Sequence, residues 1–308
     1  MATTLTLTDN SWRSKEFRTR TILEDESGRK VIKKVSITRE AQKFLNNIVK
    51  RERANTEYLK EHFDVLCGNL KGNYIEYEYL PYQSLDQKIA FELRANRCDR
   101  ADKLVDLYVQ KISSLDKTYT CPTEFLKMIS QDTFENYQFE ADCLSQGLLD
   151  LTPRNILVDG SRWIVIDNEW SFDFPIPSVF IIFRAIREIV IEFQSEIRRC
   201  TERTRPSFGF IVRGLRTYYF PENWAKYITN NSVSIEQMFK WECGFRQYVA
   251  GSRGGSIGRI KTNPRTKTHF SAWYLRNDIA VIKGMSHFLK KHPITHMLVR
   301  FLKRILFP

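Results

Sequence analysis

The chain has 308 residues, of which 42% are hydrophobic and 13% aromatic, and its formal net charge is +12. This composition predicts a globular protein with ample core material and excludes a disordered chain. The sequence has no run of about 18 apolar residues, so we expect no membrane-spanning helix. The N-terminus also lacks the pattern of a signal peptide.

Six cysteines are scattered along the sequence, with no Cys-x-x-Cys pair and no histidine at ligand spacing. We therefore expect neither a zinc site nor a disulfide framework, and we place the protein in the reducing cytoplasm. The excess positive charge attracts polyanions of several kinds, including anionic lipid and phosphorylated substrates. Because zinc-finger, RNP-type and basic-zipper patterns are absent, nucleic acid is not an expected partner.

The predicted elements begin with two strands in residues 17–37, joined by a turn at Glu26-Ser27-Gly28. A helix with apolar residues at helical spacing follows in residues 39–63, and residues 63–80 form a hairpin that turns near Gly72. After Pro81 the pattern becomes mainly helical. The order predicts an α+β fold with two lobes, a sheet-rich lobe in residues 1–80 and a mainly helical lobe in residues 81–292.

The segment DLTPRNILVDGSRWIVID, residues 150–167, combines three polar side chains with two short apolar runs. The runs flank Asp159-Gly160 and predict a hairpin that brings Asn155 and Asp167 together, with Asp150 reaching over from the preceding loop. An amide oxygen with a carboxylate suits Mg²⁺, and a separate aspartate can orient a hydroxyl and take its proton. The alternative is that these residues only cap turns and end a strand.

This pattern, D-L-x-x-x-N followed by a strand pair and I-D, resembles the catalytic and metal-binding loops of the protein-kinase-like fold. The resemblance implies ATP and Mg²⁺ as cofactors, Asp150 as the catalytic aspartate, and Asn155 and Asp167 as metal ligands. Leu148-Leu149 stands where protein kinases have His-Arg, Asn168-Glu169 stands where they have Phe-Gly, and no A-P-E segment follows. These departures resemble small-molecule enzymes such as aminoglycoside and choline kinases.

The segments LLDLTPRNILVD and IPSVFIIFRAI are also similar to kinase-like domains of bacterial O-antigen and surface-polysaccharide synthesis. A kinase-like fold implies a strand lysine for the nucleotide phosphates and a helix glutamate that holds this lysine. The strand KVIKKVSI offers Lys33 and Lys34 on opposite faces. We prefer Lys33 and keep Lys34 as its rival; Glu52 is the preferred glutamate, with Glu40 and Glu57 as alternatives.

The segment YIEYEYLPYQSL resembles the connection between lobes in these enzymes. The resemblance implies that Glu78, Tyr79 and Leu80 present backbone groups to the adenine of ATP. No G-x-G-x-x-G precedes the lysines; the corresponding segment, NSWRSKEFRTR, offers serine and arginine instead.

Two segments near the C-terminus carry further predictions. Residues 250–259, AGSRGGSIGR, are glycine-rich but lack the Gly-Lys-Ser/Thr ending of a phosphate loop, which favours a surface loop. The pattern of residues 293–308 predicts a basic amphipathic helix with an apolar stripe. This helix would dock onto protein or, as the less favoured alternative, lie on anionic lipid.

Together these resemblances imply an ATP-dependent phosphotransferase that acts on a hydroxyl of a sugar, a glycolipid or a growing surface polysaccharide. The expected partners are a carbohydrate or glycolipid acceptor, glycan-assembly proteins and, peripherally, the anionic inner face of the membrane. Two alternatives stay open. One is a catalytically silent kinase-like scaffold in glycan assembly, and the other is an aminoglycoside- or choline-type kinase.

Overall fold

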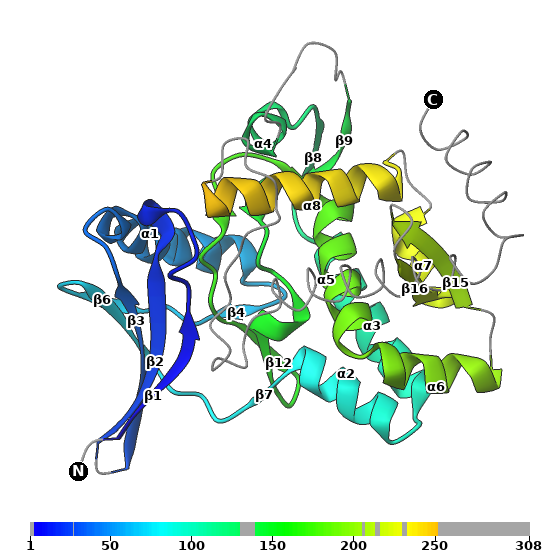
Figure 1. Ribbon diagram of the computed structural model, residues 1–308, viewed down its shortest axis with the longest axis horizontal. Helices are drawn as coiled ribbons and strands as arrows, with labels where there is room; N and C mark the ends of the chain where they lie inside the picture. The colour runs from blue at the N-terminus through cyan, green and yellow to red at the C-terminus, as the bar shows by residue number, and fades with distance from the viewer. Residues whose placement is uncertain are drawn as a thin grey trace, which may run out of the picture. The chain divides into compact units, whose positions relative to one another are not determined.

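The computed structural model describes residues 3–26, 28–129, 139–204, 207–212, 216–229 and 233–251. The chain divides into two compact units, one of residues 1–209 with 218–254 and one of residues 210–217 with 255–308. The candidate site lies in the first unit. Its N-terminal part is an antiparallel sheet with one long helix, and its C-terminal part is mainly helical, which confirms the predicted α+β class (Figure 1).

The N-terminal sheet has five strands in the order β1-β2-β3-β6-β5, and all neighbours are antiparallel. Helix α1 packs against β3, β5 and β6 through a face that buries Phe44, Leu45 and Ile48. Strand β1 was not predicted, although its Thr-Leu alternation is a strand signal. The elements of this part are β1 (Thr3–Asp9), a 3-10 turn (Lys15–Phe17), β2 (Thr19–Glu26), β3 (Arg29–Ser36), α1 (Ala41–Leu59), β4 (Asp64–Val65), β5 (Asn69–Lys71) and β6 (Tyr74–Glu78).

The C-terminal part surrounds helix α5, whose apolar residues are buried almost all the way round, as expected for a central helix. Helices α3, α6, α7 and α8 contact α5. The helices are α2 (Leu85–Arg94), α3 (Cys98–Ser113), α4 (Thr123–Ile129), α5 (Ser178–Glu192), α6 (Gln194–Thr204), α7 (Glu222–Thr229) and α8 (Ile235–Ala250). The strands are β7 (Gln83–Ser84), β8 (Lys117–Thr120), β9 (Ala141–Leu144), β10 (Gly147–Leu148), β11 (Ile156–Asp159), β12 (Arg162–Val165), β13 (Ser171–Phe172), β14 (Ile176–Pro177), β15 (Ser207–Val212) and β16 (Arg216–Pro221), and a 3-10 turn spans Pro153–Asn155.

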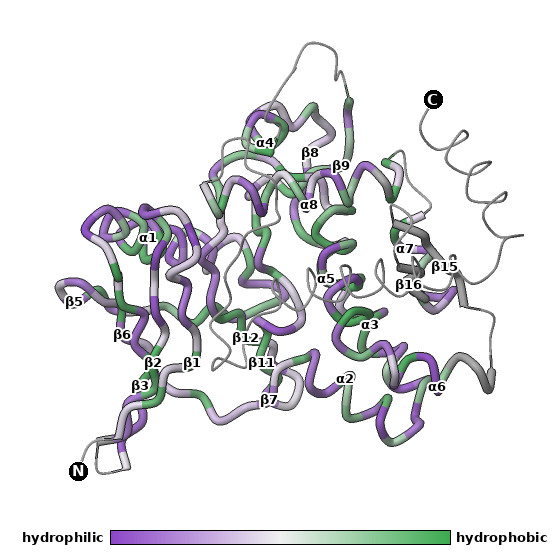
Figure 2. The backbone as a smooth tube through the Cα atoms, in the orientation of Figure 1, coloured by the Kyte–Doolittle hydropathy of each residue, from purple (hydrophilic) through white to green (hydrophobic). Residues whose placement is uncertain are grey.

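The predicted hairpin of residues 156–166 is present as β11 and β12, which pair from Ile156 with Val165 to Asp159 with Arg162. Gly160 has a φ of 59°, a left-handed conformation that glycine adopts without strain. The hairpin is extended to four strands because β4 pairs with β12 and β7 pairs with β11. Its apolar side chains are buried, and Figure 2 colours β11 and β12 as hydrophobic. The segments that contain Asn155 and Asp167 therefore adjoin one buried hairpin that has a further strand on each side.

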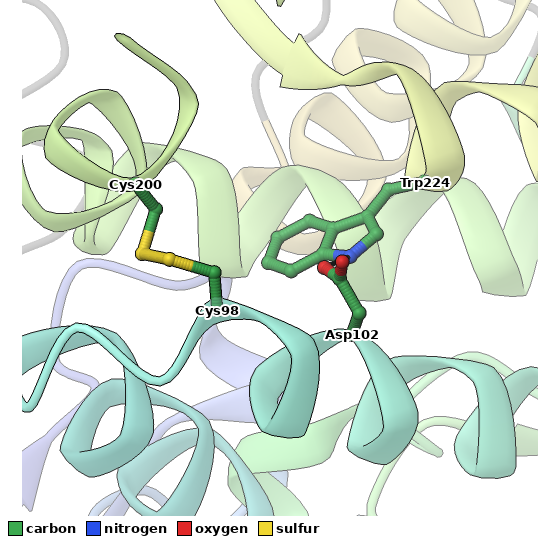
Figure 3. The surroundings of a disulfide bond; sticks show 4 residues. All are labelled: Cys98, Asp102, Cys200 and Trp224. Atoms are coloured by element: carbon green, nitrogen blue, oxygen red, sulfur yellow. Dashed lines mark hydrogen bonds between the residues drawn. A yellow bond between two sulfur atoms is a disulfide. The ribbon is translucent and has the colours of Figure 1, made fainter. Parts of the chain in front are cut away.

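The structure contains a disulfide, whereas the scattered cysteines predicted no disulfide framework. Cys98, the first residue of α3, forms a disulfide with Cys200 of α6, and their Cα atoms lie 5.8 Å apart (Figure 3). Next to this bond the indole Nε1 of Trp224 donates a hydrogen bond to Asp102, at 2.8 Å. Sequence spacing could not reveal the pair, because the two cysteines are 102 residues apart.

Several predictions fall on residues that the structure does not describe. The glycine-rich segment beyond Gly251 and the basic helix of residues 293–308 lie outside the described residues. The lobe boundary near residue 80 stays a prediction, because one compact unit contains both parts. Within the described ranges, every helix is too short or too polar to cross a membrane.

Candidate active site

Asp150 lies in the turn that follows β10, in a closely hydrogen-bonded loop. Its carbonyl accepts hydrogen bonds from the backbone N–H of Thr152 at 2.7 Å and from the side-chain amide of Asn155 at 3.1 Å. One of its carboxylate oxygens accepts a hydrogen bond from the backbone N–H of Trp170 at 3.3 Å, and the side chain is 14% exposed. The loop thus fixes the carboxylate that the sequence singles out and leaves a small part of it exposed.

Asn155 immediately precedes β11 and Asp167 follows β12, so both lie at the open end of this hairpin, as the sequence predicts. The backbone N–H of Ile166 donates to the carbonyl of Asn155 at 2.8 Å, which holds the two ends together. The Asn155 amide nitrogen is engaged with Asp150, so its amide oxygen is the atom suited to a cation. Asp167 has a φ of 51° and a side chain that is 43% exposed. A left-handed non-glycine residue stores strain and is a marker of functional sites.

The structure reverses the preferred choice between the two lysines. Lys33 forms an ion pair with Glu24 on the neighbouring strand and lies over the ring of Tyr74, away from Asp167. Lys34 is 3% exposed and forms ion pairs with Asp167 and, at 2.8 Å, with Glu169. Strand alternation places the two side chains on opposite faces, and the observed sheet turns Lys34 inward. The expectation that Lys33 faces the site is therefore wrong.

The surroundings of Lys34 fix it as a cation. Burial by itself lowers the pKa of this ammonium, but Asp167 and Glu169 outweigh burial and raise the pKa above its ordinary value. A buried lysine is stable only when its charge is paired, and two carboxylates meet that need here.

Glu52 lies inside the N-terminal part but is not the direct partner of the lysine. Its carboxylate accepts hydrogen bonds from the backbone N–H of Gly68 at 2.9 Å and from the hydroxyl of Tyr77 at 2.7 Å. Burial raises the pKa of Glu52 to about 6, although these hydrogen bonds and the charge of Lys34 act in the opposite direction. Glu52 is thus held by Gly68 and Tyr77, and Lys34 has another carboxylate as its partner.

Sequence reasoning missed this partner, Glu169. It also missed Arg13, the second cation that pairs with Glu169. Glu169 is 5% exposed, and the guanidinium of Arg13 donates to it at 2.6 Å. Burial alone would raise the pKa of Glu169, but Arg13 and Lys34 lower it to about 2. Glu169 was visible in the sequence only as a departure from Phe-Gly. Arg13 stands 156 residues earlier, in the segment that replaces the glycine-rich loop.

A third cation, Arg184 of α5, contacts the loop that contains Asp150. It donates to the carbonyl of Leu149, and its guanidinium lies 4.0 Å from the carboxylate of Asp150. Glu242 of α8 holds Arg184 at 3.0 Å. Burial, followed by the charge of Glu169, raises the pKa of Asp150 well above its ordinary value, while Arg184 opposes this shift. Asp150 is thereby a stronger proton acceptor than an exposed aspartate.

The predicted adenine-binding residues lie where the sheet connects to the helical part. Glu78 ends β6, Tyr79 is 36% exposed with Lys30 over its ring, and Leu80 follows. No group of three or more His, Cys, Asp or Glu side chains suited to a metal ion occurs among the described residues. A cation at Asn155 and Asp167 would therefore take its remaining ligands from substrate phosphates and water, which is the habit of Mg²⁺.

The sequence matches no family model and no curated protein. Among solved structures, a thermostable mutant of aminoglycoside phosphotransferase APH(4)-Ia in its apo form aligns over 92% of this chain and 94% of its own, with 11% identity and a TM-score of 0.47. A macrolide 2'-phosphotransferase type I aligns over 80% and 84%, with 11% identity and a TM-score of 0.39. The choline kinase LicA from Streptococcus pneumoniae aligns over 74% and 89%, with 13% identity and a TM-score of 0.36. Because these scores lie below 0.5, function has to be argued from the geometry of the site.

Proposed function

We propose that this protein is a kinase-like phosphotransferase that moves the γ-phosphoryl group of ATP to a hydroxyl. One observation carries the proposal: Lys34, from the N-terminal sheet, forms an ion pair with Asp167. Asp167 directly follows the β11–β12 hairpin, and Asn155 and the loop of Asp150 directly precede it. A lysine, an amide, a carboxylate for metal and a separate carboxylate are the groups that phosphoryl transfer requires. Positioning and charge neutralisation supply most of the catalysis in such a site.

The roles follow from the contacts. Asn155 and Asp167 would hold Mg²⁺, which neutralises phosphate charge when bound. Lys34 binds the phosphates of the nucleotide. Asp150 accepts a hydrogen bond from the acceptor hydroxyl and takes its proton while the acceptor oxygen bonds to phosphorus and the bond from phosphorus to the ADP oxygen breaks. The backbone of residues 78–80 would meet the adenine.

The acceptor is proposed from the resemblance in the sequence. The segments LLDLTPRNILVD and IPSVFIIFRAI are similar to kinase-like domains of surface-polysaccharide synthesis, which supports a hydroxyl of a sugar, glycolipid or growing polysaccharide as acceptor. Glycan-assembly proteins are then the expected partners. An aminoglycoside- or choline-type small molecule is the alternative acceptor.

Nucleotide binding is the first test. Thermal unfolding should shift upward with AMP-PNP and Mg²⁺ together, and much less with either alone. Asp167→Ala should abolish the dependence on Mg²⁺, because of the two proposed protein ligands, Asn155 and Asp167, it removes the charged one. Transfer of labelled γ-phosphate to a panel of sugars, lipid-linked glycans, aminoglycosides and choline would then identify the acceptor. A melting temperature that no nucleotide changes would contradict the proposal.

A second candidate function, a catalytically silent scaffold in glycan assembly, is favoured by a specific observation. The segment between β1 and β2 lacks the glycines that wrap phosphates, and it contains the buried side chain of Arg13. A scaffold would bind a protein partner without nucleotide and would be insensitive to Asp167→Ala. The same thermal measurements therefore separate the two functions.

A further inference from the structure

The connection between β1 and β2, residues 10–18, is held to the C-terminal part of the unit by three kinds of contact. Arg13 forms its 2.6 Å ion pair with Glu169, and the backbone N–H of Ser14 donates to the carbonyl of Val249 at 3.0 Å. The ring of Phe17 packs against that of Trp170, with centroids 5.0 Å apart. We call these residues the β1–β2 loop.

The loop also approaches the end of α8 closely. Gly251 ends this helix with a φ of 68°, and a Cβ atom added there would lie 2.5 Å from the Cβ of Ser14. A contact this close leaves no room for a side chain at residue 251. The loop is therefore seated on the helical part by backbone, aromatic and ionic contacts at once.

Glu169 is the point at which the loop meets the lysine. One carboxylate oxygen accepts from Arg13 at 2.6 Å and the other accepts from Lys34 at 2.8 Å. Arg13, Lys34 and Glu169 are 8%, 3% and 5% exposed, so solvent screens these charges little. A displacement of any one of them would leave a buried charge without its partner, which is strongly unfavourable.

Lys34 would need this partner when the site is loaded. In the structure its ammonium is shared between Asp167 and Glu169. A cation at Asp167 competes for that carboxylate, whereas Glu169 faces Arg13 and Lys34 and remains available to the lysine. Glu52 is committed to Gly68 and Tyr77.

We infer that Glu169 is the positioning residue for Lys34 and that Arg13 fixes Glu169, so that the β1–β2 loop and the lysine are held in place together. The inference rests on the proposed function, because it assigns how the nucleotide-binding lysine is oriented. In this arrangement the buried ion pairs of Glu169 with Arg13 and Lys34 order the β1–β2 loop. In protein kinases a glycine-rich loop covers the phosphates at this place. The carboxylate that positions the lysine then comes from Glu169, after β12, and not from Glu52 on α1.

The test is a double-mutant cycle on the affinity for AMP-PNP with Mg²⁺, measured by calorimetry. Glu169→Gln should weaken binding at least tenfold in the wild-type background. It should have little further effect in Lys34→Ala, because the residue it positions is gone. Glu24→Gln is the matched control: it removes the carboxylate that pairs with Lys33 on the opposite face and should leave the affinity within twofold.

The outcomes are distinguishable. A wild type that binds no nucleotide overturns the proposed function and the positioning role with it. A wild type that binds, with Glu169→Gln either unaffected or equally weakened in both backgrounds, overturns the positioning role alone. If Glu169→Gln does not fold, Glu169→Asp keeps the charge but shortens the reach. A weakening of about threefold to tenfold is then expected, and wild-type affinity would overturn the inference.

Discussion

Reduction of the Cys98–Cys200 disulfide should lower the free energy of unfolding substantially. The bond closes a loop of 102 residues, and loop-closure entropy in the unfolded chain gives about 4.7 kcal/mol for a loop of roughly this length. Measured contributions are often smaller, about 2–4 kcal/mol, because unfolded chains retain structure. Helix α3 keeps other links to α7, through Asp102 with Trp224 and Asp106 with Tyr227, so the loss should fall mainly on the attachment of α6.

Urea unfolding with and without reductant measures this loss. We expect the wild type to lose about 2–4 kcal/mol on reduction. The double variant Cys98→Ser/Cys200→Ser should match the reduced wild type and be insensitive to reductant, and Cys67→Ser, at an exposed free cysteine, should behave like the wild type. Peptide mapping without reduction confirms the linkage. An unfolding free energy that reduction changes by less than about 0.5 kcal/mol would refute the reasoning, since loop closure alone predicts several times more.

Three further outcomes follow from the site. Asp150→Asn should lower kcat about 100-fold or more, because the proposed proton acceptor is lost. The affinity for AMP-PNP with Mg²⁺ should stay near that of the wild type, because the proposed metal ligands remain. A kcat equal to that of the wild type would exclude the role of Asp150 as base. Lys34→Ala should lower kcat/KM for ATP about 100-fold, whereas Lys33→Ala should change it less than about threefold, and the reverse order in the same assay would restore Lys33. Glu242→Gln should cost about 3–5 kcal/mol at pH 7, since it removes a carboxylate shared by buried arginines. Burial raises the pKa of Glu242, but the arginines lower it to about 2, below the unfolded value of 4.5, so its stabilisation is complete above about pH 4.5 and is lost as the pH falls toward 2. Urea unfolding should therefore show a smaller difference between variant and wild type at pH 3 than at pH 7, and a constant difference would contradict the assignment.

The local parts of the site could be predicted from sequence, because local chemistry determines them. Asp159-Gly160 between two apolar runs predicts the hairpin, and a hairpin necessarily brings Asn155 and Asp167 to the same end. The α+β order follows in the same way from the change of hydrophobic period along the chain. These features depend on neighbours within about twenty residues.

The remainder depends on contacts between distant segments. Alternation shows that Lys33 and Lys34 face opposite ways, but only the packed sheet decides which of them is buried. Glu52 has the helical position that the resemblance implies, yet Tyr77 and Gly68 occupy its carboxylate. Arg13, one of the two partners of Glu169, lies 156 residues away in the sequence, and no pattern in either segment predicts the pair.

The charge balance of the site explains why an asparagine would suit the second position of the proposed metal site. Arg13, Lys34 and Arg184 face Asp150, Glu169 and the partly exposed Asp167, and Glu242 also pairs with Arg184, so these positive charges are already paired. A nucleotide brings several negative charges, of which Mg²⁺ offsets only two. A carboxylate at residue 155 would add one more negative charge to this balance, while an amide oxygen binds the cation without doing so. The chain's net charge of +12 therefore does not arise from these paired groups.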